Sequence, residues 1–590
     1  MKNALNGWSF ASAVPILNSP WWRDPVCLLI ILAACPFLLD SYRVSSLASY
    51  FPYAMAASAL ALVWGYCGIL ALGQAAFFGL GAYAAAKGIE SYPVAPGLVA
   101  GIFIGCAAAG ALAWILARVS FGVRAGAFLI SVMTFCTAVA FEQLALKFTS
   151  VTGGQNGIPL DRVLPKDPLL SYYIGFVVFA MLLLGMAVIT RSNLGRVIAS
   201  VRDDSMRIRF FGTNAELVQR RVFVLGAIVT AFAGVLDALY SQIAAPDRIG
   251  FAFSTFIVLW CAIGGRNSLA AAAFGALLVN MVSNELSGIF LDYWQILLAL
   301  IFIIVVMFLP DGLYWPIRVL GSRLNAPRPL QLEPAVASSS HPEGPAFVGE
   351  KLIQRFGSFT ALDVDRVSFD FGHVTALIGP NGAGKSTLIA FLSGALSDAH
   401  GKAILVGKEM LGIPIWKVAR LGVKRKFQNP RVFESLSVAD NLFIGARDPK
   451  LRMRDWLVRD QCLPIPEDVM SLARQHGLLA RLNDDAGSLA HGQKQFLEVC
   501  MVLGSQSQVV LLDEPTAGME SADRAAIGQV LVYLARSGAA VLIVEHDFDF
   551  VRSIADRILV LDQGALIADG TVSEVSEDRK VRDLYLGEGG

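Results

Sequence analysis

The chain has 590 residues, of which 55% are hydrophobic and only 16% are charged, with a formal net charge of +1 at pH 7. A soluble protein of this length does not need so much apolar sequence, so the composition excludes an entirely soluble chain and predicts membrane-spanning segments. Because the charges nearly balance, nucleic acid is not an expected partner.

Apolar stretches dominate the chain before about residue 320. Several reach the roughly 20 residues that a helix needs to cross hydrocarbon. Others are short or interrupted by Gly or Pro, as in broken or re-entrant helices. We predict an α-helical, polytopic membrane domain over residues 1–321 with eight to ten spans. The stretches lie near residues 26–40, 47–65, 68–88, 93–117, 127–148, 170–190, 222–244, 251–263, 268–290 and 292–309.

A basic loop from Arg191 to Arg221 separates two of these stretches. Its arginines outnumber its acidic residues, which places the loop in the cytoplasm by the positive-inside rule. One interpretation is a generic basic anchor. The sharper one is a short amphipathic coupling helix, beginning near Asn193 and ending near Gly212, that docks on a cytoplasmic domain.

Residues 322–345 are rich in Pro, Ala and Ser, which predicts a flexible tether between two domains. Such a tether suggests the fusion of two normally separate subunits. The remaining residues, 346–590, have room for one large α/β core with a helical subdomain around residues 435–500.

A phosphate-binding loop with the pattern G-x-x-x-x-G-K-[ST] follows the apolar run Val374–Ile378, which predicts a buried strand, and precedes a predicted helix over Leu388–Leu392. The glycines let backbone N–H groups turn inward around phosphates at a helix N-terminus. Lys385 is expected to reach the β- and γ-phosphates, and the Ser386 hydroxyl to hold Mg²⁺. The predicted nucleotide-binding residues of the loop are Gly379, Asn381, Gly382, Gly384, Lys385, Ser386 and Thr387.

Two later apolar runs each end in polar residues. Val509–Leu512 is followed by Asp513 and Glu514, and Val541–Val544 is followed after one residue by His546. The carboxyl ends of strands lie beside the nucleotide in an α/β fold. We predict that Asp513 coordinates Mg²⁺, directly or through water, and that Glu514 polarises the attacking water. His546 is predicted to hydrogen-bond the γ-phosphate. The alternative for Asp513 and Glu514 is a solvated acidic turn, and the alternative for His546 is a structural histidine.

Residues 350–575 resemble the ATPase domain of ABC transporters. Gln428 matches the glutamine of the family's Q-loop, which senses Mg²⁺ and contacts the permease, so the predicted coupling helix would dock near it. Phe356 stands where the family stacks an aromatic ring on adenine. The resemblance implies ATP and Mg²⁺ as cofactors, with Gln428 beside Ser386 and Asp513 at the metal.

Residues 489–493, Leu-Ala-His-Gly-Gln, match the family's signature motif, usually Leu-Ser-Gly-Gly-Gln. In the family this motif closes over ATP held by the opposite ATPase domain, so the resemblance implies a second ATPase domain and phosphate contacts from Ala490, Gly492 and Gln493. Ala490 and His491 depart from the pattern, and the usual serine hydroxyl is absent. Tolerated variation is the preferred interpretation, with weakened hydrolysis as the alternative.

Most of residues 40–315 resemble permeases of branched-chain amino acid (LIV-type) importers. Four elements in order carry this resemblance: residues 65–74 with Phe77, Gly79 and residues 80–83, then residues 152–157, 264–266 and 310–313. The family usually has His where Gln74 stands and Ser where Ala71 stands. Glycine spacing also serves close helix packing, and we expect most of these glycines to do only that. Within the ATPase, residues 425–434 resemble the urea and short-amide branch of the same family.

Together the resemblances imply an ATP-driven importer, with permease and ATPase fused, in the bacterial cytoplasmic membrane and with the ATPase in the cytoplasm. They imply as partners a second permease or ATPase subunit and a periplasmic or extracellular solute-binding protein. Branched-chain or other amino acids are the first substrate expectation, and urea or short-chain amides the alternative. A membrane-anchored regulatory ATPase that does not transport is an alternative of another class.

Overall fold

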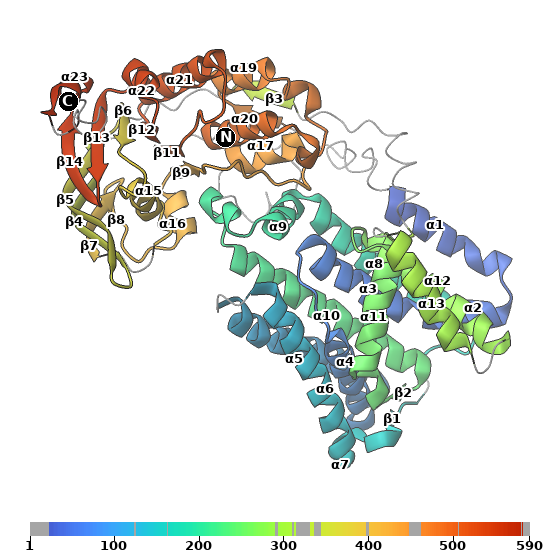
Figure 1. Cartoon of the computed structure of the whole chain (residues 1–590). Helices are drawn as coiled ribbons and strands as arrows, with labels where there is room; N and C mark the ends of the chain where they lie inside the picture. The colour runs from blue at the N-terminus through green and yellow to red at the C-terminus, as the bar shows by residue number, and fades with distance from the viewer. Residues whose placement is uncertain are drawn as a thin grey trace, which may run out of the picture. The chain divides into compact units, whose positions relative to one another are not determined.

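The computed structural model describes residues 23–122, 126–161, 163–289, 293–309, 312–313, 331–334, 344–396, 400–447, 462–504, 507–579 and 581 (Figure 1). They fall into two compact units. The first contains the chain up to Arg202 and the apolar residues from Glu216 onward. The second combines Asp203–Ala215 with the residues after 329. Most of the predicted tether, residues 322–345, lies outside the described residues.

The first unit is built from apolar helices. They are α1 (Arg23–Leu38), α2 (Ser41–Ser49), α3 (Phe51–Leu60), α4 (Gln74–Ser91), α5 (Val94–Gly122), α6 (Gly126–Lys147), α7 (Thr149–Thr152), α8 (Pro168–Arg191), α9 (Asn193–Asp203, which ends one residue inside the second unit), α10 (Ala215–Ser241), α11 (Phe251–Gly264), α12 (Leu269–Ile289) and α13 (Trp294–Phe308). A two-stranded ribbon pairs β1 (Ile158–Pro159) with β2 (Ile243–Ala244).

The predicted helical membrane domain is confirmed. Within the described residues, six segments are long and apolar enough to cross a membrane, judged by length and composition alone: Ser41–Tyr66, Val94–Phe121, Phe128–Lys147, Pro168–Arg191, Ala215–Ser241 and Leu269–Gly288. This is fewer than the eight to ten spans predicted, because other apolar stretches form shorter helices. The helix α11, for example, has 14 residues and α13 has 15.

The segment after Ser41–Tyr66 shows how a Gly-rich sequence breaks a membrane helix. The helix ends in a π-helical turn, Ala61–Tyr66, and the chain is irregular until Gln74 begins α4. A Cβ atom on Gly73 would lie 1.7 Å from the backbone oxygen of Thr134, so only glycine fits there. The Gln74 side chain is buried and donates to the Thr230 hydroxyl at 2.6 Å.

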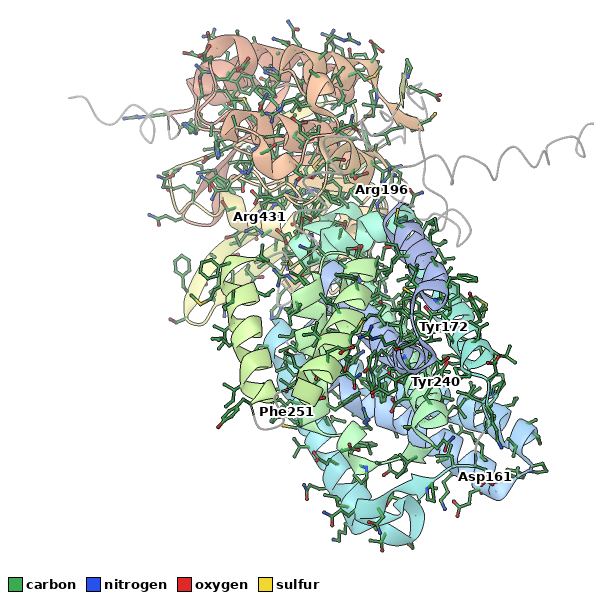
Figure 2. All side chains as sticks on the ribbon, turned by 90° about the vertical axis from the view of Figure 1, so that its right-hand side faces the viewer. Asp161, Tyr172, Arg196, Tyr240, Phe251 and Arg431 are labelled. Carbon is green, nitrogen blue, oxygen red and sulfur yellow. The ribbon has the colours of Figure 1, made fainter. Side chains whose placement is uncertain are left out.

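Close packing explains other glycines of this unit, as predicted. On α4, a Cβ at Gly81 would lie 1.8 Å from the backbone oxygen of Ala231 on α10. Tyrosine hydroxyls also link the helices: Tyr172 on α8 donates to the Leu32 carbonyl at 2.7 Å, and Tyr240 on α10 donates to the Ser171 carbonyl at 2.8 Å (Figure 2).

The second unit is an α/β domain with two sheets, in the strand orders β14-β13-β6-β12-β11-β9 and β5-β4-β7-β8. In the larger sheet β13, β6, β12, β11 and β9 run parallel, and β14 is antiparallel to β13. The larger sheet contains β6 (Val374–Ile378), β9 (Val423–Lys426), β11 (Val509–Asp513), β12 (Ala540–Val544), β13 (Arg557–Asp562) and β14 (Ala565–Gly570).

The smaller sheet is antiparallel and contains β4 (Pro345–Phe356), β5 (Phe359–Asp370), β7 (His400–Leu405) and β8 (Lys408–Glu409). A separate parallel pair joins β3 (Gln331–Pro334) to β10 (Cys462–Ile465). The principal helices of this unit are α15 (Lys385–Leu392), α16 (Ile415–Arg420), α17 (Val438–Ala446), α19 (Glu467–Gln475), α20 (His491–Leu503), α21 (Ser521–Arg536), α22 (Phe548–Ile554) and α23 (Val572–Glu577).

The three strands predicted around the nucleotide are all present. Every residue of β6, β11 and β12 is buried, so both faces of the sheet are covered at these strands. This burial explains why their sequences are nearly continuous apolar runs. Since β12 lies between β6 and β11, the residues that follow these strands emerge at the same edge of the sheet. The predicted helical subdomain around 435–500 is also present, with α17 packed on α20.

Candidate nucleotide site

The phosphate-binding loop joins β6 to α15. Gly379, Gly382 and Gly384 all have positive φ angles, 153°, 85° and 101°, a backbone conformation that favours glycine. Gly384 is the N-cap of α15, which begins at Lys385, three residues before the predicted start. Ser386 and Thr387 therefore lie in the first turn of this helix. The backbone N–H groups at this helix start are suited to an anion.

The Lys385 ammonium folds back on its own loop, where it donates to the carbonyls of Gly379 at 2.6 Å and Pro380 at 2.8 Å. Burial lowers the pKa of Lys385, and the nearby Glu514 and Asp513 carboxylates oppose that shift. A bound phosphate could accept from the ammonium in place of the two carbonyls. It would then pair with a positive charge that is already positioned in the loop.

Asp513 ends β11, with its side chain only 10% exposed and 3.7 Å from the Arg425 guanidinium. Burial raises the pKa of Asp513, and the positive charge of Arg425 opposes the shift. Glu514 follows with a φ of 45°, and its Oε2 accepts a hydrogen bond from Gln428 Nε2 at 2.9 Å. The fold thus brings together Lys385, Gln428 and the carboxylate pair, as the sequence predicts.

His546 follows β12 at the same sheet edge, with a side chain that is 70% exposed. Sequence reasoning missed its neighbour Glu545, which is 1% exposed. Glu545 Oε1 accepts from both the Thr516 hydroxyl at 2.7 Å and the Thr516 N–H at 3.1 Å. It fastens the chain after β11 to the end of β12. A carboxylate directly after a fully apolar strand was the signal available.

The predicted signature residues lie at the start of α20. Ala490 is the N-cap residue and supplies no side-chain cap, as expected from the missing serine hydroxyl. Gln493 accepts from Arg481 at 3.0 Å, so its side chain is held within the helical subdomain. Two residues on, Gln495 donates to the Ala517 carbonyl at 3.1 Å. The start of α20 is therefore tied to the segment that follows Glu514.

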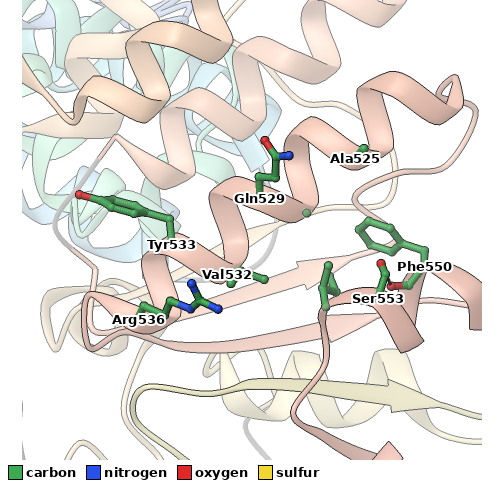
Figure 3. Close-up of a pocket in the computed structure, with 9 residues that line it drawn as sticks. Ala525, Gln529, Val532, Tyr533, Arg536, Phe550 and Ser553 are labelled. Carbon is green, nitrogen blue, oxygen red and sulfur yellow. Dashed lines mark hydrogen bonds between the residues drawn. The ribbon is translucent and has the colours of Figure 1, made fainter.

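Phe356 ends β4 with 53% of its surface exposed, which leaves its ring open to a planar ligand. A separate surface hollow lies between α21 and α22 (Figure 3). Its lining includes Gln529, Tyr533 and Phe550 and none of the predicted nucleotide-binding residues. We assign it no role in nucleotide binding.

The segment Asp203–Ala215 packs within the second unit. The predicted coupling helix is present as α9, which begins at Asn193 but ends at Asp203, and the chain on to Gly212 forms a short 3₁₀ helix, Arg207–Phe211. The Phe210 ring meets the Phe427 ring edge-on at 4.9 Å, directly beside Gln428 in sequence. The docking position predicted for this loop is therefore observed.

Charged groups anchor the same segment. Arg207 and Glu498, both with fully buried side chains, form an ion pair at 2.6 Å. Asp203 accepts from the Ser435 N–H and hydroxyl at 2.8 and 2.7 Å. The Gly212 carbonyl accepts from Arg420 at 2.8 Å. Glu498 lies on α20, so the helix that begins with the signature residues also binds this segment.

Comparison with known families matches both units. Residues 42–306 match the permease component of the branched-chain amino acid transport system, and residues 362–517 match the ABC transporter family. The ATP-binding protein BraF for high-affinity branched-chain amino acid transport in Pseudomonas aeruginosa is 32% identical over 251 residues. The match covers 40% of this chain and 96% of BraF.

Two further relatives cover the same part of the chain. LivG of Escherichia coli K12, a high-affinity branched-chain amino acid transport ATP-binding protein, is 30% identical over 251 residues, 40% of this chain and 96% of LivG. A probable LivG of Methanocaldococcus jannaschii is 32% identical, with the same coverages. A crystal structure of a nucleotide-free ATP-binding cassette from an ABC transporter is 28% identical and covers 42% of this chain and all of its own, with a TM-score of 0.36.

The phosphate-binding loop, the carboxylates after β11 and the helical subdomain define an ABC-type ATPase joined to a membrane domain. The chain belongs to the branched-chain amino acid family of ABC transporters, with the permease and ATP-binding parts fused in one polypeptide. It is an ATP-hydrolysing membrane protein whose ATPase lies in the cytoplasm.

Proposed function

We propose that this chain imports branched-chain amino acids, using ATP hydrolysis by its own cytoplasmic domain. The observation that carries the proposal is the joint occurrence of a permease match over residues 42–306 and ATP-binding relatives named for branched-chain amino acid transport. Urea and short-chain amides are the second candidate, favoured by the sequences of residues 425–434, 491–495 and 517–519.

The nucleotide site supports the following roles. Lys385 and the loop N–H groups bind the phosphates, and Phe356 stacks on adenine. Glu514 polarises the attacking water, and Gln428, which holds its carboxylate at 2.9 Å, positions it and reports to the permease. His546 contacts the γ-phosphate. The His546 side chain is 70% exposed and is therefore free to turn toward a bound nucleotide.

The oxygen ligands in the site fit Mg²⁺, which prefers few carboxylates together with phosphate oxygens. Asp513 supplies a carboxylate, Ser386 a hydroxyl and Gln428 an amide oxygen. Among the described residues, no group of three His, Cys, Asp or Glu side chains gathers to hold a metal by itself. The metal would neutralise charge on the nucleotide phosphates, and Asp513 would hold it directly or through water.

ATP closes a pair of ATPase domains in importers of this type, and the permease converts the closure into alternating access. Asp203–Ala215 is the element suited to transmit that motion, because it contacts Phe427 beside the Q-loop and Glu498 on α20. The proposed partners are a second permease or ATPase subunit and a solute-binding protein. The proposed division of the chain is permease over 1–321, tether over 322–345 and ATPase over 346–590.

The test is solute-stimulated ATPase activity of the reconstituted complex with its binding protein. Leucine, other amino acids and urea are added in turn, and Glu514→Gln is the catalytic control. We expect stimulation by branched-chain amino acids and a loss of at least about 100-fold in the mutant. Stimulation by urea alone would replace the proposed substrate, and no response to any solute would favour a regulatory ATPase.

A further inference from the structure

A buried polar chain lies in the first unit, outside any role assigned so far. The Arg248 guanidinium donates to the Tyr53 hydroxyl at 2.5 Å, and Tyr53 is hydrogen-bonded to the Asp237 carboxylate. Asp237 is only 3% exposed. The residues come from three elements: Tyr53 from α3, Asp237 from α10 and Arg248 from the 3₁₀ turn before α11. One hydroxyl therefore separates a carboxylate from a guanidinium.

The cluster lies toward the C-terminal end of α10. The helix α10 begins at Ala215, next to the segment that packs with the cytoplasmic unit. Asp237 follows 22 residues later, roughly 33 Å along the helix axis, about the thickness of the hydrocarbon core. Asp237 is therefore near the extracytoplasmic side, where a solute enters.

Aromatic rings surround the charges. Arg248 lies over the rings of Tyr53 and Phe253, 5.5 and 5.3 Å from their centroids. Tyr53 also stacks on Trp260 at 4.9 Å, and Phe253 meets Phe78 at 4.9 Å. The cluster sets the buried Asp237 carboxylate and the partly exposed Arg248 guanidinium beside an apolar aromatic wall, and Arg248 also lies 3.7 Å from the exposed Asp247 carboxylate.

Burying the Asp237 carboxylate in a membrane domain is expensive, and an apolar residue of the same volume would pack as stably. Ionisable groups at such positions usually serve a substrate pathway. An α-amino acid carries its ammonium and carboxylate on a single carbon, so one molecule matches both charges of the cluster. A guanidinium binds carboxylate bidentately, and aromatic rings accommodate a branched apolar side chain.

We propose that Asp237 and Arg248 form a binding site for zwitterionic α-amino acids in the permease, closed in this structure by the Tyr53 hydroxyl. Asp237 receives the ammonium group, Arg248 receives the carboxylate, and Phe253 and Trp260 contact the side chain. When a solute arrives, it takes the place of Tyr53 between the two charges. Urea, which carries no charge, gains nothing from displacing Tyr53. This inference rests on the proposed amino acid import and specifies where the permease recognises its substrate.

The experiment measures binding of radiolabelled leucine to the purified transporter complex without its binding protein. Competitors are unlabelled leucine, leucinamide, which lacks the carboxylate, 4-methylpentanoate, which lacks the ammonium, and urea. We expect only leucine to compete. Asp237→Asn and Arg248→Gln should each weaken binding by at least about tenfold, since each removes one partner of a desolvated charge pair.

The matched control is Arg43→Gln. Arg43 pairs with Glu285 at 3.2 Å in the same unit, with both side chains about half exposed, and should leave leucine binding within about twofold of wild type. Tyr53→Phe preserves the ring and removes only the hydroxyl. This variant tests the site if the charge variants fail to assemble. Because leucine no longer has to displace the hydroxyl, we expect its affinity to rise by about twofold to tenfold.

Some results would overturn this inference but leave the proposed import intact. One is a wild-type complex that transports leucine with its binding protein but shows no saturable leucine binding without it. Another is a leucine affinity that is unchanged in Tyr53→Phe and in the charge variants. Equal competition by leucinamide or 4-methylpentanoate would also overturn it. A wild-type complex stimulated by urea and by no amino acid would remove the proposed function as well, so the two failures are distinguishable.

Discussion

At the scale of single residues, the nucleotide site contains charged side chains that are partly buried and need polar partners. The Lys385 ammonium is satisfied by two loop carbonyls, and Gln428 holds Glu514. Asp513 is buried, and its partner Arg425 stands 3.7 Å away. Keeping this carboxylate in place costs stability, and its proposed role as an oxygen ligand of Mg²⁺ accounts for its retention.

The cost is measurable through pH. Burial raises the pKa of Asp513, so folding favours the protonated carboxyl. That contribution to stability is fully present below the ordinary pKa of Asp and is lost as pH rises through the folded value. Asp513→Asn is neutral at every pH. We therefore expect the variant to unfold at a higher temperature than wild type at pH about 8, while its ATPase activity is lost.

The measurement is thermal unfolding of nucleotide-free protein at pH about 5 and about 8, with ATPase activity assayed in parallel. The difference in unfolding temperature between Asp513→Asn and wild type should be smaller at the lower pH. An Asn variant less stable than wild type at the higher pH would show that the pairing with Arg425 outweighs burial.

At the scale of elements, the Arg207–Glu498 ion pair joins the segment Asp203–Ala215 to α20. Both side chains are fully buried at 2.6 Å, so removing one partner leaves an uncompensated buried charge. We expect Arg207→Ala and Glu498→Ala each to lower the unfolding free energy by about 3–5 kcal/mol. The double variant Arg207→Met, Glu498→Leu should recover most of this loss.

Denaturant unfolding of wild type, the two alanine variants and the double variant Arg207→Ala, Glu498→Ala gives the coupling energy of the pair. Glu434→Ala is the control, because Glu434 pairs with Lys494 at 2.7 Å but has a 66% exposed side chain, and should change stability by less than about 1 kcal/mol. Additive single-variant effects would show that Arg207 and Glu498 act independently.

Helix approach in the membrane domain gives a second prediction at this scale. Alanine normally favours a helix over glycine by up to about 1 kcal/mol. At Gly81, however, the added Cβ would lie 1.8 Å from the Ala231 carbonyl oxygen of α10, so backbone must move. We expect Gly81→Ala to reduce the yield of folded protein, and Gly185→Ala on α8, where the Cβ meets nothing within 4 Å, to leave it unchanged.

Folded yield is read from the monodisperse fraction after detergent extraction and from the melting temperature of that fraction. If Gly81→Ala matched Gly185→Ala in both, the close approach of α4 and α10 would be without energetic consequence.

The elements also show what local sequence can and cannot predict. Strands such as β6 and β11 are buried on both faces, so composition alone reveals them, and the phosphate-binding loop fixes Lys385 between them. Arg207 and Glu498 are 291 residues apart, and no local pattern encodes their pairing. Asp237 was missed, although an acidic residue within a long apolar run was the signal available.

At the scale of the whole molecule, the chain joins two compact units that the ATP-binding relatives do not combine, since those relatives match only the second part of it. The contacts of Asp203–Ala215 should hold the ATPase without the covalent tether. We expect a chain cleaved at a protease site inserted near residue 338 to remain one complex and keep its solute-stimulated ATPase activity.

The same cleavage in an Arg207→Glu chain should release the ATPase fragment, because two carboxylates would then face each other in a buried site. Co-elution after cleavage is the readout, with uncleaved protein as the control. Release of the fragment from the otherwise unaltered cleaved chain would show that the tether, and not this segment, keeps the parts together.

The placement of Asp203–Ala215 has a consequence for biosynthesis. This segment leaves the ribosome long before Glu498 exists, and translation at about 5–20 residues per second makes the interval roughly 15–60 s. During that time Arg207, Phe210 and Phe211 have no folded surface to enter. Maturation of the fused chain therefore includes a waiting period in which this segment is open to chaperones and proteases, and the ATPase must finish folding around residues made much earlier.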